Sequence, residues 1–247
     1  MREIRVIPLC GIPELEEEDD LGALLVESAE RAASLENGDI VVVAQKAVSK
    51  IEGRVLHLDQ IQPSDRAREL AGDEDARRIE AILRESRRIV RMRPPTLIIS
   101  ETPHGFVCAS AGVDRSNAKG PSTLILLPLD PDASARILRD RIRELSGVDV
   151  GVIVSDSFGR PFRRGTTDVA LGVSGVSPLL DLKGTRDSIG YELHATEIAV
   201  ADEIAGAAEL VMGKTDGVPA AIVRGLDLRG DGSGQDLLMP SERDLFR

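Results

Sequence analysis

The segment from Val148 to Gly175 constrains the fold of this chain more than any other part of the sequence. Within it, Val150–Val154 is an apolar run rich in β-branched residues, which is typical of a short strand buried on both faces. The run ends at Ser155-Asp156-Ser157. We therefore expect one carboxylate and two hydroxyls to leave the core together at the end of a strand. Oxygen ligands of this kind, held on a rigid element, suit a hard cation.

A loop rich in arginine follows this strand. It contains Arg160, Arg163 and Arg164, with Gly159 and Gly165 at its two ends. Arginine binds phosphate or carboxylate through two parallel hydrogen bonds, and glycine lets the backbone approach a ligand. One interpretation is a site for a metal-bound polyphosphate or an anionic substrate. The other is a surface turn whose arginines pair with some of the 42 acidic residues, and the loop alone does not separate the two.

The order of the expected elements predicts an α+β fold. β-branched runs predict strands, and capping residues followed by apolar side chains at helical spacing predict helices. Strands are expected at residues 4–8, 39–44, 124–127, 150–154 and 219–223, with antiparallel strands between 96 and 113. Helices are expected at residues 19–37, 63–71, 74–86, 130–147 and 196–212, and loops at 45–53 and 230–235. Because strand–helix units alternate with hairpins, a mixed fold of antiparallel sheets and helices fits better than a doubly wound sheet.

The length of 247 residues fits one large domain or two small ones. We expect a single functional unit over residues 1–247 that contains two subdomains. One subdomain would combine residues 1–93 with 186–247, and the other would hold residues 94–185. The breaks between them would lie near Pro94-Pro95, where the pattern of elements is interrupted, and again near residues 180–190.

Composition excludes several classes of partner. The net charge is −11 and aromatic residues make up 2%, which argues against nucleic acid, because nucleic acid selects basic patches and stacking rings. A local basic cluster or a metal ion must therefore attract any anionic ligand. No apolar run approaches the ~18 residues of a membrane span. With only Cys10 and Cys108, and no secretory segment at the N-terminus, we expect a cytoplasmic protein without a disulfide framework.

Four loops combine oxygen ligands or cations at the ends of expected elements. They contain Lys50, Asp114 with Asn117, Asp156 with Ser157, and Thr215 with Asp216. Asp114 and Asp156 are candidates to share a metal pair, which in two-metal sites lies ~3.5–4 Å apart and clamps a transferring phosphoryl group. Lys50 would neutralise phosphate oxygens as their charge shifts. The spacing does not show that these loops converge, and each residue alone is also typical of a turn.

The triplet Gly213-Lys214-Thr215 is similar to the end of a phosphate-binding P-loop. However, Ala208 stands where that motif requires a glycine, and the triplet follows an expected helix instead of opening one. We therefore do not assign it as a P-loop.

Nine short motifs along nearly the whole chain resemble, in the same order, those of the γ-glutamyl ligases that elongate the deazaflavin coenzyme F420. They are Gly11-Ile12-Pro13, Ser49-Lys50-Ile51-Glu52-Gly53, Ala111-Gly112-Val113-Asp114-Arg115-Ser116-Asn117, Asp156-Ser157-Phe158-Gly159-Arg160, Arg163-Arg164-Gly165, Gly172-Val173-Ser174-Gly175, Ala201-Asp202-Glu203-Ile204-Ala205, Met212-Gly213 with Gly217-Val218-Pro219, and Val223-Arg224-Gly225. Nine ordered matches are far more specific than any single motif.

The resemblance implies a GTP-dependent ligase that needs two divalent cations, Mg²⁺ or Mn²⁺, and often K⁺. Members of the family attach L-glutamate to the lactyl-phosphate carboxylate of the unglutamylated coenzyme, and then add further glutamates through γ-linkages. The resemblance also implies a homodimer with an α+β fold peculiar to the family and an active site near the subunit interface.

The same resemblance assigns roles to individual residues. Asp114 and Asp156 would be metal ligands with the help of Ser157, which stands where relatives often carry threonine. The residues that would hold GTP are Gly11, Ile12, Pro13, Glu14, Gln45, Lys46, Lys50 and Asn117.

The chemistry gives Lys50 and the arginine loop a catalytic role. GTP would convert a carboxylate into an acyl phosphate, and the glutamate amine would then displace phosphate. Because two anions must meet, the site needs metal ions and a cation such as Lys50. We hypothesise that Arg160 and Arg163, with Arg164, hold the phosphodiester of the acceptor or the carboxylates of the incoming glutamate.

Two other functions remain open at this point. One is a GTP-dependent amide ligase that acts on another phosphorylated carboxylate. The other is a metal- and anion-binding regulator without turnover.

Overall fold

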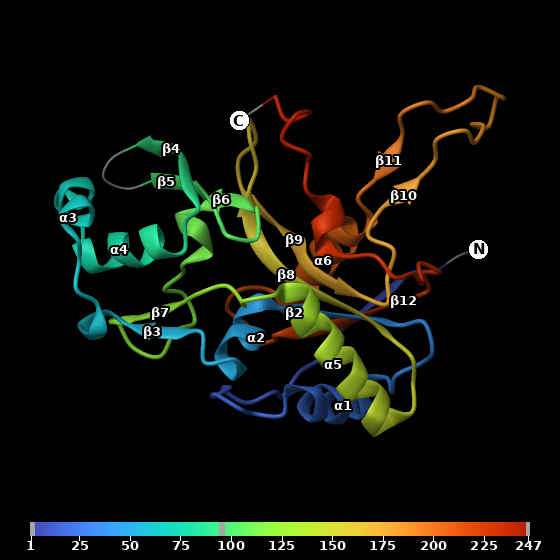
Figure 1. The fold of residues 1–247 in the computed structure, drawn as a ribbon. Helices are drawn as coiled ribbons and strands as arrows, with labels where there is room; N and C mark the ends of the chain where they lie inside the picture. The colour runs from blue at the N-terminus through green and yellow to red at the C-terminus, as the bar shows by residue number, and fades with distance from the viewer. Residues whose placement is uncertain (1–2, 94–96, 246–247) are drawn as a thin grey trace.

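The computed structural model describes residues 3–93 and 97–245, and its centre is a five-stranded sheet with the strand order β1-β12-β2-β8-β9 (Figure 1). The strands are β1 (Arg5–Pro8), β12 (Ala220–Arg224), β2 (Ile40–Ala44), β8 (Gly151–Gly159) and β9 (Thr166–Ser174). β2 and β8 are parallel, whereas the other neighbouring pairs are antiparallel. The carboxyl ends of β2 and β8 therefore lie at the same end of the sheet.

Helices cover both faces of this sheet. The helices of the chain are α1 (Leu21–Ala32), α2 (Gln45–Ile51), α3 (Asp65–Ala71), α4 (Ala76–Arg84), α5 (Pro131–Ser146) and α6 (Val200–Met212). Successive side chains of a strand point to opposite faces, so Val41 and Val43 of β2 pack with α1 and α5, whereas Ile40 and Val42 pack with α6. The sheet thus lies between two helical layers, which confirms the predicted α+β class.

Capping residues explain where three of the helices begin. Asp20, Ser64 and Asp130 each accept a hydrogen bond from a backbone N–H in the first turn of α1, α3 and α5. Pro131 fits the first turn of α5, and Gly147 ends this helix in a left-handed conformation. These three predicted helices are confirmed, although α1 is shorter than expected because it ends at Ala32.

A smaller lobe beside the sheet has its own core. Its strands are β3 (Val55–His57), β4 (Arg88–Arg93), β5 (Leu97–Glu101), β6 (Val107–Ala109) and β7 (Thr123–Ile125). β4, β5 and β6 form an antiparallel sheet; β5 and β6 confirm the antiparallel strands predicted between 96 and 113, whereas β4 lies before that range and was not predicted. β3 pairs with β7. α3 and α4 pack against these strands, with Ile79, Ile82, Ile98 and Leu124 in the core.

Three local predictions were wrong. Residues 45–51 form helix α2 instead of a loop, because Ala47 and Val48 are buried in the core that includes α1 and α5. β8 continues through Ser155–Ser157 to Gly159, so these polar residues lie inside a strand and not beyond its end. The tail expected to be a flexible loop forms a 3₁₀ turn at Gly234–Leu237, and Gly234 lies against the backbone of Leu171.

An arm extends from the body between β9 and α6 (Figure 1, orange). β10 (Leu180–Asp181) and β11 (Glu197–Ile198) pair at its base. Helix α6 therefore begins at Val200 and not at residue 196 as predicted, because Glu197 and Ile198 are used as a strand.

The arrangement of the cores differs from the predicted subdomains. β8 and β9, from the predicted 94–185 unit, belong to the same sheet as β2 and β12, and the core of the small lobe uses residues on both sides of position 94. The proposed break at Pro94-Pro95 itself lies outside the described residues. Over residues 3–93 and 97–245, no helix has the length and apolar character needed to span a membrane.

Candidate active site

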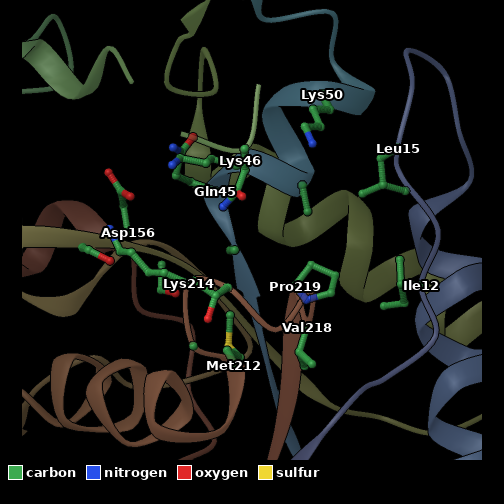
Figure 2. Close-up of a pocket in the computed structure, with 18 of the residues that line it drawn as sticks. Ile12, Leu15, Gln45, Lys46, Lys50, Asp156, Met212, Lys214, Val218 and Pro219 are labelled. Atoms are coloured by element: carbon green, nitrogen blue, oxygen red, sulfur yellow. The ribbon is translucent and has the colours of Figure 1, made fainter. Parts of the chain in front are cut away.

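A pocket of about 580 Å³ lies at the carboxyl end of β2, beside Ser155–Ser157 in the middle of β8 (Figure 2). Its walls come from the segment after β1, from α2, from the loop around residue 117, from β8 and β9, and from the loop that follows α6. In Figure 2, Ile12 and Leu15 lie on one side of the pocket, and Asp156 lies on the opposite side. The pocket therefore has an apolar side and a polar side, as expected for a site that binds a ligand with both characters.

Helix α2 presents two lysines to the pocket. Lys46 and Lys50 are four residues apart, so they lie on the same face of the helix. The ammonium group of Lys50 donates to Oε1 of Glu14 at 2.5 Å, and its side chain is only 12% exposed. Lys46 donates to Oδ2 of Asp114 at 2.6 Å and to the hydroxyl of Ser116. Two partly buried cations thus stand ready for an anionic ligand.

Gln45, at the start of α2, is buried and lines the same pocket. Its Oε1 accepts a hydrogen bond from the hydroxyl of Ser49 at 2.9 Å. Its Nε2 has no hydrogen-bond partner among the described residues. Because an unsatisfied buried donor costs free energy, this amide is a candidate contact for a ligand of the pocket.

Asp114 carries a negative charge in this site. Burial alone would raise the pKa of Asp114, but hydrogen bonds from Lys46 and from the backbone and hydroxyl of Ser116 outweigh it and lower the pKa to about 2. Lys46 therefore holds Asp114 ionised, and the pair connects α2 with the loop before β7.

At Asp156 the effects on the pKa balance in the opposite direction from those at Asp114. Burial, with a smaller contribution from the negative charges of Asp168 and Asp114, outweighs the backbone N–H of Ser157 and the charge of Lys46 and raises the pKa of this carboxyl to about 7. Asp114 and Asp156 are thus close enough to interact, although 42 residues separate them in the sequence. The structure brings together the two carboxylates that the sequence analysis assigned to one site.

Sequence reasoning missed a carboxylate that lies beside them. Asp168 of β9 is buried, and it accepts hydrogen bonds from the hydroxyls of Ser155 at 2.9 Å and Ser157 at 2.6 Å. Its own backbone N–H donates to Oε2 of Glu209 on α6 at 3.2 Å. Asp168 directly follows the threonine pair Thr166-Thr167, and no spacing rule in the sequence pointed to it.

The other residues assigned to nucleotide binding lie at or next to the pocket. Ile12, Pro13, Glu14 and Asn117 line it. Gly11 immediately precedes this wall and has a φ of 77°, which glycine adopts without strain. Asn117 also has a positive φ, of 58°, as asparagine tolerates better than most residues.

The loop after α6 also contributes to the pocket. Lys214 and Thr215 line it, as does Lys119 from the loop before β7. The triplet 213–215 follows α6, as expected, so it is not built like a P-loop, yet it reaches the same cavity. The sequence analysis included Thr215 among the candidate oxygen ligands and gave Lys119 and Lys214 no role.

The arginine loop lies elsewhere. Arg160, Arg163 and Arg164 are exposed at the tip of the β8–β9 hairpin and do not line the pocket. Arg160 donates to the backbone carbonyl of Arg164 at 3.2 Å. The strand rises about 3.3 Å per residue, so the backbone of Arg160 lies roughly 13 Å beyond Asp156.

The donor set at the pocket fits a hard divalent cation. Asp114, Asp156 and the hydroxyl of Ser157 supply oxygen ligands, which Mg²⁺ and Mn²⁺ prefer. No described side chain donates a hydrogen bond to the carboxylate of Asp156, whose neighbouring charges include two further carboxylates. Over the described part of the chain, however, no group of three or more His, Cys, Asp or Glu side chains is arranged to hold a metal ion. Such a cation would therefore need ligands from a substrate or from water as well.

Comparison with known proteins identifies the family. A family model described as F420-0:Gamma-glutamyl ligase matches residues 11–225. The chain is 50% identical over 237 residues to the coenzyme F420:L-glutamate ligase of Methanopyrus kandleri, covering 93% of this chain and 92% of the relative. It is 46% identical to the protein of the same name from Methanothermobacter thermautotrophicus, covering 99% of both chains, and 44% identical to that of Archaeoglobus fulgidus, covering 99% and 96%. The chain therefore belongs to the F420-0:gamma-glutamyl ligase family.

Proposed function

We propose that this chain is a GTP- and divalent-metal-dependent ligase that adds L-glutamate to the unglutamylated precursor of coenzyme F420, and then adds further glutamates through γ-linkages. The names of its relatives support the glutamate ligation. The observation that carries the proposal is the convergence of Asp114 with Lys46 and Asp156, two residues that line a pocket together with Lys50.

The pocket offers distinct surroundings for the two parts of GTP. The apolar side chains that line it suit a purine base, and they are Ile12, Leu15, Met212, Val218 and Pro219. Lys46 and Lys50 suit the phosphates, and the free Nε2 of Gln45 is a further donor. A volume of about 580 Å³ lies within the range of small-ligand sites, which run from about 300 to 1,000 Å³.

Asp114, Asp156 and Ser157 would hold two divalent cations, which would neutralise phosphate charge and position the transferring phosphoryl group. We include Mg²⁺ or Mn²⁺ as the divalent ion, and K⁺ as an additional ion. Lys50 would stabilise the charge that develops on the γ-phosphate oxygens. Its ion pair with Glu14 fixes the ammonium group, and Glu14 is 53% exposed, so a ligand phosphate can replace it at little cost.

The reaction would proceed in two displacements. In the first, a carboxylate oxygen of the acceptor attacks the γ-phosphorus of GTP, the bond to the bridging oxygen breaks, and GDP leaves. In the second, the amine of glutamate attacks the acyl carbon and inorganic phosphate leaves with the electron pair of its C–O bond. The amine loses a proton to solvent, and an amide remains. The chain's role in both steps is to bring anions together and to exclude water.

The activity can be tested with the purified chain, GTP, Mn²⁺ or Mg²⁺, K⁺, L-glutamate and the unglutamylated coenzyme. We expect mass spectrometry to show products heavier by one or more glutamyl residues, and phosphate release that depends on both glutamate and acceptor. Release of phosphate that depends on another phosphorylated carboxylate would redirect the proposal to a different acceptor. Absence of phosphate release with bound GTP and metal would favour a regulator and contradict the ligase.

We also propose that the chain acts as a homodimer in the cytoplasm. The arm between β10 and β11 supports an additional contact surface, because Ile189 is 90% exposed and Tyr191 is 62% exposed there. Light scattering after size exclusion should give twice the mass of the 26.5 kDa chain. A monomer at micromolar concentration would contradict this part of the proposal.

A further inference from the structure

The hydroxyls of Ser155 and Ser157 are both directed to one carboxylate. Ser157 donates to Oδ1 of Asp168 at 2.6 Å, and Ser155 donates to Oδ2 at 2.9 Å. A hydroxyl has one proton and two lone pairs. Because each proton is used in a bond to Asp168, the lone pairs of Ser157 are left for another group in the pocket that Ser157 lines, on the opposite face of β8 from the side chain of Asp156.

A β-bulge makes this arrangement possible. The register of β8 and β9 shifts between Val154 and Ser155, so that Ser157 pairs with Asp168 across the strands. With the register that precedes the bulge, Ser157 would pair with Val169, and Asp168 would point to the opposite face of the sheet. Bulges often redirect a side chain beside a functional site.

Helix α6 fixes Asp168 from the other side. β9 is the edge strand of the sheet, and its outward N–H groups at Asp168 and Ala170 donate to Glu209 at 3.2 Å and to Asp202 at 2.9 Å. Gly206 lets the helix approach closely, because a Cβ there would lie 3.3 Å from the hydroxyl of Thr167. The carboxylate of Asp168 is therefore held in place by both the bulge and the helix.

We propose that Asp168 is a positioning residue that directs the hydroxyl of Ser157 so that its lone pairs bind the divalent cation of the site. It acts through Ser157 and not as a ligand itself. The inference rests on the proposed function only in that the site takes a divalent cation. Partners that orient metal ligands typically change metal affinity by about 10- to 100-fold when they are removed.

Asp168→Asn tests this role without changing the shape of the side chain. The amide oxygen can accept a hydrogen bond from one serine hydroxyl, but the NH₂ group then faces the other serine and donates to it, so that the proton of this second hydroxyl must turn elsewhere. We expect Mn²⁺ affinity, measured by electron paramagnetic resonance without substrates, to fall about 10- to 100-fold. We also expect kcat to recover at saturating Mn²⁺.

Asp132→Asn is the matched control. Asp132 also holds a strand and a loop together, because it accepts hydrogen bonds from the backbones of Val173 and Gly234 and from the hydroxyl of Ser233, but it does not line the pocket. Both variants are expected to lose some thermal stability. Only Asp168→Asn should weaken Mn²⁺ binding. Equal Mn²⁺ affinity in the two variants would show that Asp168 has a structural role alone, and would overturn the proposal.

A double-mutant cycle separates positioning from direct ligation. If Asp168 acts through Ser157, adding Asp168→Asn to Ser157→Ala should weaken Mn²⁺ binding no further. Additive losses would mean that Asp168 is itself a ligand, and would overturn the inference. If the wild-type chain binds Mn²⁺ but forms no amide, the ligase function is contradicted, and the test of Asp168 remains valid. If the wild-type chain binds no Mn²⁺, the positioning role is overturned.

Discussion

The β8–β9 hairpin has a pocket end, which contains Ser155–Ser157 and Asp168, and a tip, which contains residues 160–165. The polar side chains of the pocket end are buried or partly buried and most have hydrogen-bond partners, whereas those of the tip are exposed. Ser155 is 1% exposed and Asp168 is 6% exposed, and both belong to a hydrogen-bonded group. Arg163 and Arg164 at the tip are exposed, and Arg160 donates to the backbone carbonyl of Arg164 within the tip. The two ends lie on the same pair of strands, yet only one has its geometry set before a ligand arrives.

This contrast shows which charged and polar groups are already fixed in position for the chemistry. Preorganised groups stabilise a transition state without reorganising when the reaction takes place. Long exposed side chains must first be ordered by the substrate, at roughly 0.5–1.5 kcal/mol each. We therefore expect the pocket end to control turnover, and the tip to affect acceptor binding more weakly.

The largest effect should come from Asp156→Asn, which removes a proposed metal ligand but keeps the shape of the side chain. We expect ligase activity to fall by more than the roughly 10- to 100-fold that loss of a supporting residue causes. Burial raises the pKa of Asp156 to about 7, so ionising it costs stability as the pH rises through that value. The variant should therefore melt at the same or a higher temperature than the wild type in chelator at pH 8.

Asp187→Asn is the control for this change. Asp187 lies on the exposed arm, where it accepts hydrogen bonds from the backbones of Ile189 and Tyr191. We expect Asp187→Asn to leave the ligase activity unchanged. Wild-type turnover by Asp156→Asn would show that the pocket end does not carry the chemistry.

Lys50→Ala should produce the next largest effect. The side chain is 12% exposed and fixed by Glu14, so its charge acts in partly desolvated surroundings. We expect kcat for the ligation to fall about 100-fold, as when one preorganised donor is removed from a charged transition state. Lys183→Ala removes an ion-paired lysine on the arm and should change kcat little. A change in the KM for GTP alone would restrict Lys50 to binding.

Several features of the pocket end could be predicted from the sequence because their signals are local. The caps at Asp20 and Asp130 and the β-branched run at Val150–Val154 identified α1, α5 and the buried part of β8. The ordered motifs pointed to Asp114 and Asp156, which the structure places in one site.

The remaining features depend on pairing between distant segments. The bulge that places Asp168 opposite Ser157 follows from the register of two strands, which no single segment encodes. The polar residues of 45–51 predict a loop, because the core contacts of Ala47 and Val48 that make this segment helix α2 involve distant parts of the chain. The arginine loop was grouped with Asp156 because the residues are close in sequence, whereas the extended strand carries them apart.

Arg163→Ala tests whether the exposed tip takes part at all. If the tip orders on an anionic acceptor, we expect the KM for the acceptor to rise about 10-fold, the loss of about 1.4 kcal/mol, with the KM for GTP unchanged. Arg136→Ala on α5 removes the same charge from another exposed position and serves as the control. Unchanged kinetics in Arg163→Ala would assign that arginine to the surface and sharpen the contrast between the two ends.

The smallest effect is expected at Asp202, which holds the pocket end of β9 by accepting the N–H of Ala170 at 2.9 Å. Burial raises the pKa of this carboxyl, and the hydrogen bond only partly offsets it. A raised pKa in the folded state means that stability is greatest below the unfolded pKa of about 3.9 and falls as the pH rises through the folded value.

Asp202→Asn keeps an acceptor for Ala170 and removes the buried charge, while Glu203 still supplies a negative charge to the first turn of α6. We therefore expect the melting temperature to rise by about 1–3 °C at pH 7, and this gain to shrink as the pH is lowered toward 4. Calorimetry at several pH values would measure both trends. A lower melting temperature at every pH would mean that the charge of Asp202 strengthens its hold on the edge strand, and that the pocket end depends on ionised carboxylates even where no ligand is bound.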